Sequence, residues 1–412
     1  MTDFSKAARK ITWILFANQS LASAGFIAAA TINSILGAQL GGSDYWTGVP
    51  SAVYLLGSAF AASAWGYIME RIGRRNSMTL GLVIGVIGNT LVLFAIRAAS
   101  LPEFLLGMLL MGITNAAVIL GRFAAAEVNP PDRRGKAISL VVWGGTFGAV
   151  VGPLLVGPMG SFVKTFGMNE LAGPYLSTLI LFMLAAAVVF TGLRPDPREL
   201  GREVAALYPE TNPHGSETRP LLTIMRQPAA LTALTAMVLG QVVMVGLMVI
   251  TSRHMNHHQH GLTDISHVIQ AHTIGMYAFS IISGWLVDRW GRKAVIITGA
   301  LLLTAACVTA PLSPDVLPLG IALFLLGLGW NFCFVGGSTL LADQLSPAER
   351  SRTQGFNDLL VGLASATASL SSGLIFAATS YTVISIVAGG LSLIPLVLAM
   401  IGLRNRPASA TG

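Results

Sequence analysis

The chain has 412 residues, of which 53% are hydrophobic and only 10% are charged. A soluble domain averages about 25% charged residues. The apolar residues form long runs, many near the ~20 residues that a bilayer-spanning helix needs. This composition excludes a soluble protein and indicates a polytopic all-α membrane protein. The two cysteines, Cys307 and Cys333, lie in different apolar runs and imply no disulfide framework.

The polar and basic segment Met1 to Lys10 leads into the first apolar run, and no convincing cleavage site follows. We therefore expect a retained helix and not a signal peptide. We place twelve spans at 11–38, 47–69, 77–98, 103–127, 137–162, 173–193, 228–251, 266–287, 294–311, 316–342, 355–378 and 381–403. Residues 195–222, rich in Pro and charge and without periodicity, are expected to be a cytoplasmic linker between six-helix bundles at 1–194 and 223–412.

The net charge is +7, and its distribution argues against nucleic acid as a partner. With these spans, 22 of the 25 Lys and Arg fall on one side, leaving Arg97, Lys164 and Arg253 on the other. This is the positive-inside pattern of a membrane protein. It predicts that both termini are cytoplasmic.

A ten-residue pattern occurs twice, 218 residues apart. The first copy, 66–75, includes Glu70, Arg71 and Arg74, and the second, 284–293, includes Asp288, Arg289 and Arg292. Glycine permits a tight turn, and the acidic residue suits a helix N-terminus. A weaker echo pairs Asn129-Pro-Pro-Asp132-Arg133-Arg134 with Ser346-Pro347-Ala-Glu349-Arg350.

The doubled pattern resembles the signature loop of the major facilitator superfamily, and the resemblance covers the whole chain. It implies two pseudo-symmetric six-helix bundles around a central path, with alternating access. In the fifth span, Gly144, Gly148, Gly152-Pro153 and Gly157 resemble the antiporter motif of drug exporters, although Val156 replaces one expected glycine. Glycines four apart also allow close helix packing, the interpretation that we favour.

Few ionisable residues lie at membrane depth. Arg122, Glu127, Asp343 and Asp358 all fall near the predicted inner interface, where ion pairs between the halves or snorkelling are expected. The absence of Asp or Glu near any midplane weakens a proton-coupled exporter, without excluding coupling through His272. A set of polar residues in the spans has two open interpretations: they line the path, or they bond to neighbouring helices. These residues are Asn18, Gln19, Thr31, Asn33, Asn115 and Asn331.

Two helices around a histidine-rich turn carry the main candidate site. Met244 and Met248 are four apart on one helix, and His272 and Met276 are four apart on the next. In an antiparallel hairpin, two residues at the same depth have residue numbers that add up to a constant. The numbers of Met248 and His272 add up to the same value as those of Met244 and Met276. Each methionine of the first helix is therefore expected at the depth of one of these residues on the second helix. Methionine is a common gap-filler, but a histidine inside an apolar helix needs a partner.

Thioethers and imidazole with no nearby carboxylate favour a soft ion such as Cu(I). Cys333 is a reserve ligand, although plain packing is the commoner role of such a cysteine. The turn faces the non-cytoplasmic side in this topology. Two interpretations of its histidines stay open: they collect metal at the mouth of the path, or they have no such role. These histidines are His254, His257, His258 and His260, with His267 at the start of the return helix.

The Met-x-x-x-Met and His-x-x-x-Met pair resembles that of the CcoA-type copper importers of bacteria, which supply copper for cytochrome oxidase assembly. The stretches around Gly275 and Trp330 are also similar. The same group contains riboflavin importers. Copper importers of this kind also carry cysteines thought to matter for activity, and the presence of only two cysteines here puts any thiol-dependent step in doubt.

We therefore expect a monomeric copper importer in the inner membrane of a bacterium. Copper is the transported substrate, no permanently bound cofactor is expected, and a cytoplasmic copper chaperone is a candidate partner. A flavin or other nutrient importer is the first alternative, using Trp13, Phe16, Trp330 and Phe334. A proton-coupled drug exporter is the second. A membrane sensor is disfavoured because no soluble signalling domain is attached, and no nucleotide loop or nucleophile constellation indicates an enzyme.

Overall fold

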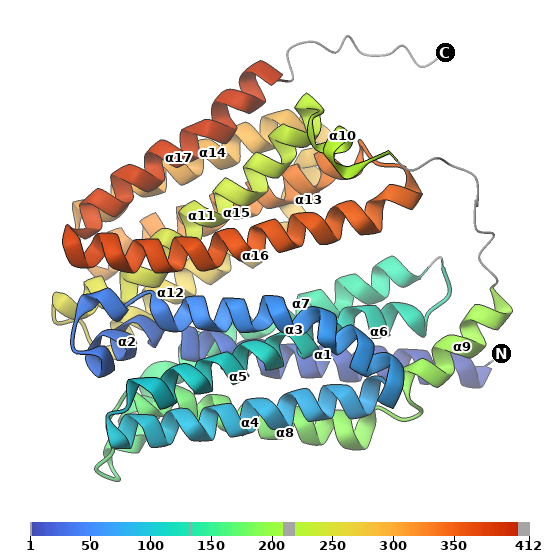
Figure 1. Ribbon diagram of the computed structural model, residues 1–412, viewed down its shortest axis with the longest axis horizontal. Coiled ribbons are helices and arrows are strands. Elements are labelled where there is room, and N and C mark those ends of the chain that lie inside the picture. The colour runs from blue at the N-terminus through green and yellow to red at the C-terminus, as the bar shows by residue number, and fades with distance from the viewer. Residues whose placement is uncertain (1, 132, 209–218, 403–412) are drawn as a thin grey trace. The chain divides into compact units, whose positions relative to one another are not determined.

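The computed structural model describes residues 2–131, 133–208 and 219–402, and within these ranges the chain is helical and contains no strand (Figure 1). Two compact units divide the chain. One comprises residues 1–212 together with Gly261–Ser266, and the other comprises residues 213–260 and 267–412. The boundary at residue 212 falls inside the predicted linker.

The N-terminal unit contains one helix or helix pair for each of the first six predicted spans. The first predicted span, 11–38, is broken at residues 31–32, and the fourth is broken at Leu120. The helices are α1 (Thr2–Ala30), α2 (Asn33–Gly41), the 3₁₀ turn η1 (Asp44–Trp46), α3 (Val49–Ile72), α4 (Arg74–Ala98), α5 (Leu101–Ile119), α6 (Gly121–Glu127), α7 (Arg134–Lys164) and α8 (Ala172–Gly192).

Glycines bring α7 into close contact with α1. A Cβ atom at Gly144, Gly148 or Gly152 would collide with the backbone of α1 at Phe16, at Ser20 or at Ala24, respectively. Residues four apart share a face of a helix, so the three glycines form one smooth stripe along α7. The contacts confirm the packing role expected for this run.

The C-terminal unit repeats the arrangement. Its helices are α10 (Leu221–Met225), α11 (Pro228–His257), α12 (Leu262–Tyr277) from His267 onward, α13 (Ser280–Trp290), α14 (Arg292–Thr309), the 3₁₀ turn η2 (Ala310–Leu312), α15 (Val316–Ala342), α16 (Pro347–Ala378) and α17 (Tyr381–Gly402). The short α12 and α13 follow one another in the yellow to orange part of Figure 1.

One predicted span is discontinuous. In the described residues, 11 helical segments are long and apolar enough to cross a membrane, and the predicted span 266–287 is missing from them because it is divided into α12 and α13. Asn331 of α15 lies beside the break. Its Nδ2 atom donates to the carbonyl of Met276 (2.7 Å) and to the hydroxyl of Ser280 (2.9 Å), and its Oδ1 accepts from Ser283. The amide thus supplies hydrogen-bond partners where the helix is interrupted, as an apolar surrounding requires.

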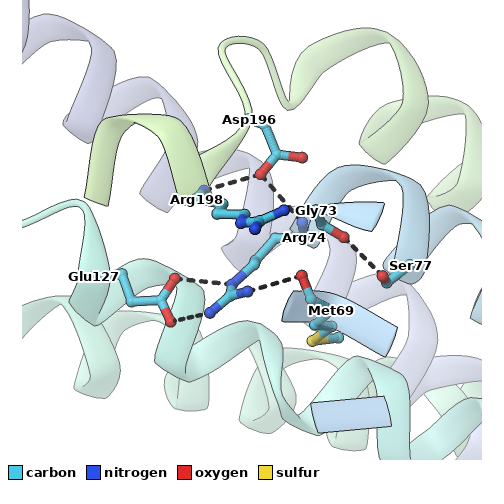
Figure 2. A network of polar contacts seen from close by, with 7 residues as sticks. All are labelled: Met69, Gly73, Arg74, Ser77, Glu127, Asp196 and Arg198. Atoms are coloured by element: carbon cyan, nitrogen blue, oxygen red, sulfur yellow. Dashed lines mark hydrogen bonds and ion pairs between the residues drawn. The ribbon is translucent and has the colours of Figure 1, made fainter. Parts of the chain in front are cut away.

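The repeated motif forms the same turn twice. Gly73 has φ 86° and ψ 167°, and Gly291 has φ 85° and ψ 156°. Directly after Gly73, Arg74 pairs with Glu127 at 2.7 Å and donates to the carbonyl of Met69 (Figure 2). The matching arginine of the second copy pairs with Asp343 at 2.8 Å and donates to the carbonyl of Val287. The sequence repeat is therefore a structural repeat.

The predicted linker contains a helix. α9 (Pro197–Leu207) buries Leu200 and Val204, and it belongs to the N-terminal unit. The expectation of a segment without regular structure is wrong here, because α9 is amphipathic and too short to register as an apolar run. Residues 209–218 of the predicted linker lie outside the described residues, as does Asp132 of the weaker repeat, and the side chain of Arg350 is also not described.

Asp196, just before α9, caps two helices. Its Oδ1 atom accepts from the backbone N–H of Arg74 (3.1 Å) and of Arg198 (2.9 Å), and its Oδ2 accepts from the N–H of Arg75 (3.0 Å). The acidic residues of the repeated motif were expected at a helix N-terminus, but Glu70 and Asp288 lie in the last turns of α3 and α13. The carboxylate that serves the start of α4 comes from the linker instead.

Candidate functional site

The candidate site lies in the C-terminal unit, on α11, α12 and α15. Residues 258–261 join α11 to α12, which places the turn where the predicted hairpin requires it. α12 packs tightly on α15 because a Cβ atom at Gly275 would collide with the carbonyl of Phe324, and one at Gly327 with the carbonyl of His272. Glycine on both helices lets the two backbones approach.

His272 is fully buried, and its Nδ1 atom lies 2.9 Å from the carbonyl oxygen of Leu323 on α15. A carbonyl oxygen only accepts, so Nδ1 carries a hydrogen, and in the neutral imidazole Nε2 then presents its lone pair. Nε2 is buried and has no hydrogen-bond partner within the described part of the chain. The close α12–α15 approach thus fixes the tautomer of the neutral imidazole, with Nε2 as its acceptor nitrogen.

The contacts of α11 with α15 show at which level along the helix axis Met244 and Met248 lie. Gly240 lies against Cys333, and Met237 lies against Gly337, so the two helices run in opposite directions. Met244 and Met248 follow Gly240 at four-residue steps and share its face of α11. Met244 therefore lies near the level of residue 329 on α15, and Met248 lies near residue 325.

The contacts of α12 with α15 place the other two residues. His272 lies against Leu323 and Met276 bonds to Asn331, with Gly275 against Phe324 between them, so α12 runs in the same direction as α15. His272 lies near the level of residue 324 and Met276 near residue 328. Each methionine of α11 is therefore within about two residues of the depth of its counterpart on α12, at 1.5 Å of rise per residue. Met244 and Met276 are 6% and 8% exposed, respectively.

The indole of Trp330 on α15 joins the two other helices. Its Nε1 atom donates to Oε1 of Gln241 on α11 (2.6 Å), and its ring lies edge-on to Tyr277 of α12, with centroids 6.2 Å apart. Phe334 stacks on the same indole at 5.2 Å. Gln241 and Tyr277 were not identified from the sequence, because no spacing links them. They lie three residues before Met244 and one residue after Met276.

The histidines of the turn pack against aromatic residues. His254 stacks on Tyr381 (4.2 Å between centroids, 7° between planes), and His257 stacks on Phe376 at 5.5 Å. The ring of His258 lies 4.8 Å from that of His254. Among the described residues, no group of three or more His, Cys, Asp or Glu comes together. Metal collection by these histidines, with His260 and His267, stays a prediction.

The expected gating residues divide between ion pairs and ring contacts. Glu127 pairs with Arg74 and Asp343 with Arg292, so both partners of each pair belong to one half, whereas ion pairs between the halves or snorkelling were expected. The remaining members of the set lie on the surface or on a ring: Arg71 over Tyr67, Arg289 over Trp285 and Arg122 over Phe123, with Glu70, Asp288 and Asp358 exposed.

Several polar residues that were left undecided bond to neighbouring helices. Asn33 accepts from Tyr175, Asn115 donates to Ser58, and Asn331 holds the α12–α13 break. Both cysteines are buried and free, and Cys333 packs where α11 and α14 approach α15. Its sulfur lies 3.9 Å from the carbonyl of Ile296, which is a packing position.

Two related helical halves with spans of this length define a multi-pass membrane protein. The family model described as Major Facilitator Superfamily matches residues 15–266 and 246–412. The chain is 36% identical to the uncharacterised MFS-type transporter YdeG of Bacillus subtilis, over 95% of this chain and 91% of that protein. It is 30% identical to the riboflavin transporter RfnT of Brucella anthropi, over 100% of this chain and 99% of that protein.

The crystal structure of the nucleoside transporter NupG superposes with a TM-score of 0.73 at 14% identity, covering 96% of this chain and 100% of that one. At this identity the likeness concerns the fold alone. The chain belongs to the major facilitator superfamily, as the repeated loop motif indicated. It is a multi-pass membrane transporter.

Proposed function

We propose that this transporter imports copper, as Cu(I), into the cytoplasm of a bacterium through Met244, Met248, His272 and Met276. The observation that carries the proposal is the unpartnered Nε2 atom of His272 in a fully buried position. A buried polar atom without a partner costs about 1–3 kcal/mol. Its presence within the predicted span 266–287 calls for a ligand that accepts a lone pair.

The hydrogen bond to Leu323 supports the same role. Histidines that bind metals usually donate their other ring N–H to a carbonyl or carboxylate, which holds the tautomer and the ring. His272 has this arrangement, with Nδ1 bound 2.9 Å from the carbonyl oxygen. The imidazole needs no further proton transfer before Nε2 binds an ion.

The other donors suit a soft ion of low charge. Thioethers bind Cu(I) without losing a proton, whereas hard cations require oxygen ligands. Met244 and Met276 are nearly buried, and both share depth with their counterparts across the hairpin. Thioethers also bind more weakly than thiolates, which allows the ion to leave.

In the proposed cycle, copper enters near Met248 and His272, passes to Met244 and Met276, and leaves inward when the halves rock. Alternating access of this kind is general for transporters built from repeats. Copper is the cargo, and the protein works without a permanent cofactor. A cytoplasmic copper chaperone is a suitable acceptor for the released ion. The inner membrane, cytoplasmic termini and a monomeric state complete the proposal.

Copper content of whole cells tests the proposal. Cells that express the wild-type chain should accumulate copper, and H272A or M276A should lower the accumulation roughly tenfold or more. M183A is the matched control, because Met183 is 47% exposed on α8 and far along the chain from the site. Membrane levels of each variant are measured in parallel. Unchanged copper accumulation in H272A, at equal membrane level, contradicts the proposal.

Import of a flavin or similar flat nutrient is the second candidate. The specific observation in its favour is the cluster of Gln241, Tyr277, Trp330 and Phe334, which combines aromatic faces with one amide. Flat ligands bind to such apolar sites with few polar groups, and one relative is named a riboflavin transporter. W330A would abolish riboflavin uptake under this alternative while H272A would spare it. The opposite pattern in copper uptake favours the metal.

A further inference from the structure

A basic cavity of about 610 Å³ lies in the N-terminal unit, between the α3–α4 turn and the start of α9. It is remote in the chain from the candidate copper site and has no part in the proposed transport. Five arginines line it, with only two carboxylates: Arg71, Arg75, Arg194, Arg198 and Arg202, with Asp196 and Glu199. The cavity therefore carries a formal excess of positive charge.

The hydrogen bonds of Asp196 go to backbone groups and not to the guanidinium groups of these arginines. Its Oδ1 atom accepts from the backbone N–H groups of Arg74 and Arg198 (Figure 2), and its Oδ2 atom accepts from that of Arg75, all at 2.9–3.1 Å. The carboxylate thus serves the N-termini of α4 and α9, and within the described residues it forms no ion pair with a guanidinium of the cavity. Glu199 is exposed on α9.

Three of the arginines are held in place by contacts that leave their charge unpaired. Arg71 lies over the ring of Tyr67 at 4.4 Å. Arg75 lies over the ring of Phe190 at 4.6 Å and donates to the carbonyl of that residue. Arg198 donates to the carbonyl of Arg71 at 3.2 Å. Rings and carbonyls position a guanidinium without neutralising it.

Arg194 and Arg202 are exposed, and their side chains form no hydrogen bond or ion pair in the described part of the chain. Lys10 adds a further cation, since its Nζ atom lies 3.4 Å from the carbonyl of Arg194. Tyr67 and Phe190, on which two of the other arginines rest, are 55% and 49% exposed. Exposed aromatic residues beside arginines are typical of the membrane surface, where lipid headgroups lie.

We propose that this cavity binds a phosphate group, presented by an anionic lipid or by a soluble phosphate compound. Arginine matches phosphate oxygens with paired N–H donors, and several guanidinium groups converge here. Basic pockets at the ends of membrane helices are suited to anionic headgroups. The bound phosphate would tie the α3–α4 turn to α9, because both segments contribute arginines.

The purified full-length protein in detergent tests the proposal by thermal unfolding. Phosphatidylglycerol, phosphatidylcholine with the same chains, and glycerol phosphate are added in separate series. The variant R194Q/R202Q removes two side chains that have no bond within the described protein, so its fold should persist. R97Q/R226Q removes two charges elsewhere and is the matched control, because both arginines are exposed and outside the cavity.

We expect phosphatidylglycerol to raise the unfolding temperature of the wild type and of R97Q/R226Q. R194Q/R202Q should need roughly tenfold more of this lipid for the same rise. An equal effect of glycerol phosphate, lost in the same variant, identifies a soluble compound as the source. Equal responses of R194Q/R202Q and the control to every additive, or no response of the wild type, would overturn the proposal.

Discussion

The Nδ1 atom of His272 lies 2.9 Å from the carbonyl oxygen of Leu323, on a helix 51 residues further along the chain. This bond assigns the proton of the imidazole and leaves Nε2 as a free acceptor. Two glycines, Gly275 and Gly327, make the bond possible by letting α12 and α15 approach. A local packing feature thus prepares the chemistry of the proposed site.

The two ring nitrogens of His272 have separable roles. Asparagine places an amide near the position of Nδ1 but has nothing at Nε2. We expect H272N to unfold near the wild-type temperature, because its amide can still donate to Leu323, and to lose copper accumulation. H272L should unfold at a lower temperature than the wild type and should also lose copper accumulation, since leucine replaces neither nitrogen. Copper content and thermal unfolding are measured on each variant, and full copper accumulation by H272N would exclude Nε2 as a ligand.

Asn331 stabilises the break between α12 and α13. Its side chain is 3% exposed and bonds to the carbonyl of Met276 and to the hydroxyls of Ser280 and Ser283. We expect N331A to lower the free energy of unfolding by about 1–3 kcal/mol, because buried polar groups lose their partners. Denaturant or thermal unfolding in detergent measures the change.

Asn115 provides the comparison, because it is partly buried and its amide donates to the hydroxyl of Ser58 at 3.1 Å. N115A should cost less than N331A. A larger loss for N115A would show that the amide at the helix break contributes little to stability.

The repeated glycines differ in their surroundings. Gly73 and Gly291 both have positive φ and a ψ near 160°, a conformation that other residues adopt at a cost of about 1–3 kcal/mol. A Cβ atom at Gly73 would also collide with Asp196, whereas one at Gly291 meets open space. We expect G73A to destabilise the protein more than G291A does, in thermal unfolding.

Gly66 supplies the control for both variants. It lies inside α3, and a Cβ atom there meets nothing within 4 Å. G66A should be neutral or slightly stabilising. Similar losses in all three variants would argue against backbone conformation as the cause.

We expect Glu349 to make the C-terminal unit sensitive to acid. Its carboxylate, 2% exposed, bonds to the guanidinium of Arg219 at 2.7 and 2.8 Å and accepts backbone N–H groups of Ser346 and Arg219. The side-chain bonds from Arg219, and then the backbone bonds, lower the pKa of Glu349 below its ordinary value of 4.5. A lowered carboxyl pKa contributes stability above the ordinary value, and this stability is lost as the pH falls toward the lowered one.

E349Q should therefore be less stable than the wild type at pH 7 and should show a smaller loss between pH 5 and acid. The unfolding temperature, measured from neutral pH down to about pH 3, checks both parts. An E349Q variant that loses stability in acid as steeply as the wild type would show that other carboxylates cause the acid sensitivity.

The sequence was sufficient for the features that depend on local or repeated patterns. Hydropathy located eleven of the twelve predicted spans, because each must cover the bilayer with apolar residues, but it did not reveal the break within 266–287. The doubled motif predicted two matching halves, and Gly73 and Gly291 adopt matching conformations. The four-residue spacings of Met244 with Met248 and of His272 with Met276 were visible for the same reason, since residues on one helix face recur at fixed steps.

The tertiary structure decided what distant residues do to one another. Asn331 lies 55 residues from Met276, and only the packing of α15 on α12 shows that it serves a broken helix. Gln241 joins Trp330 across 89 residues, and Asp196 reaches the start of α4 across 122. No local pattern marks such pairs, because hydrogen bonding and burial depend on which helices become neighbours, and that is settled only when the whole unit packs.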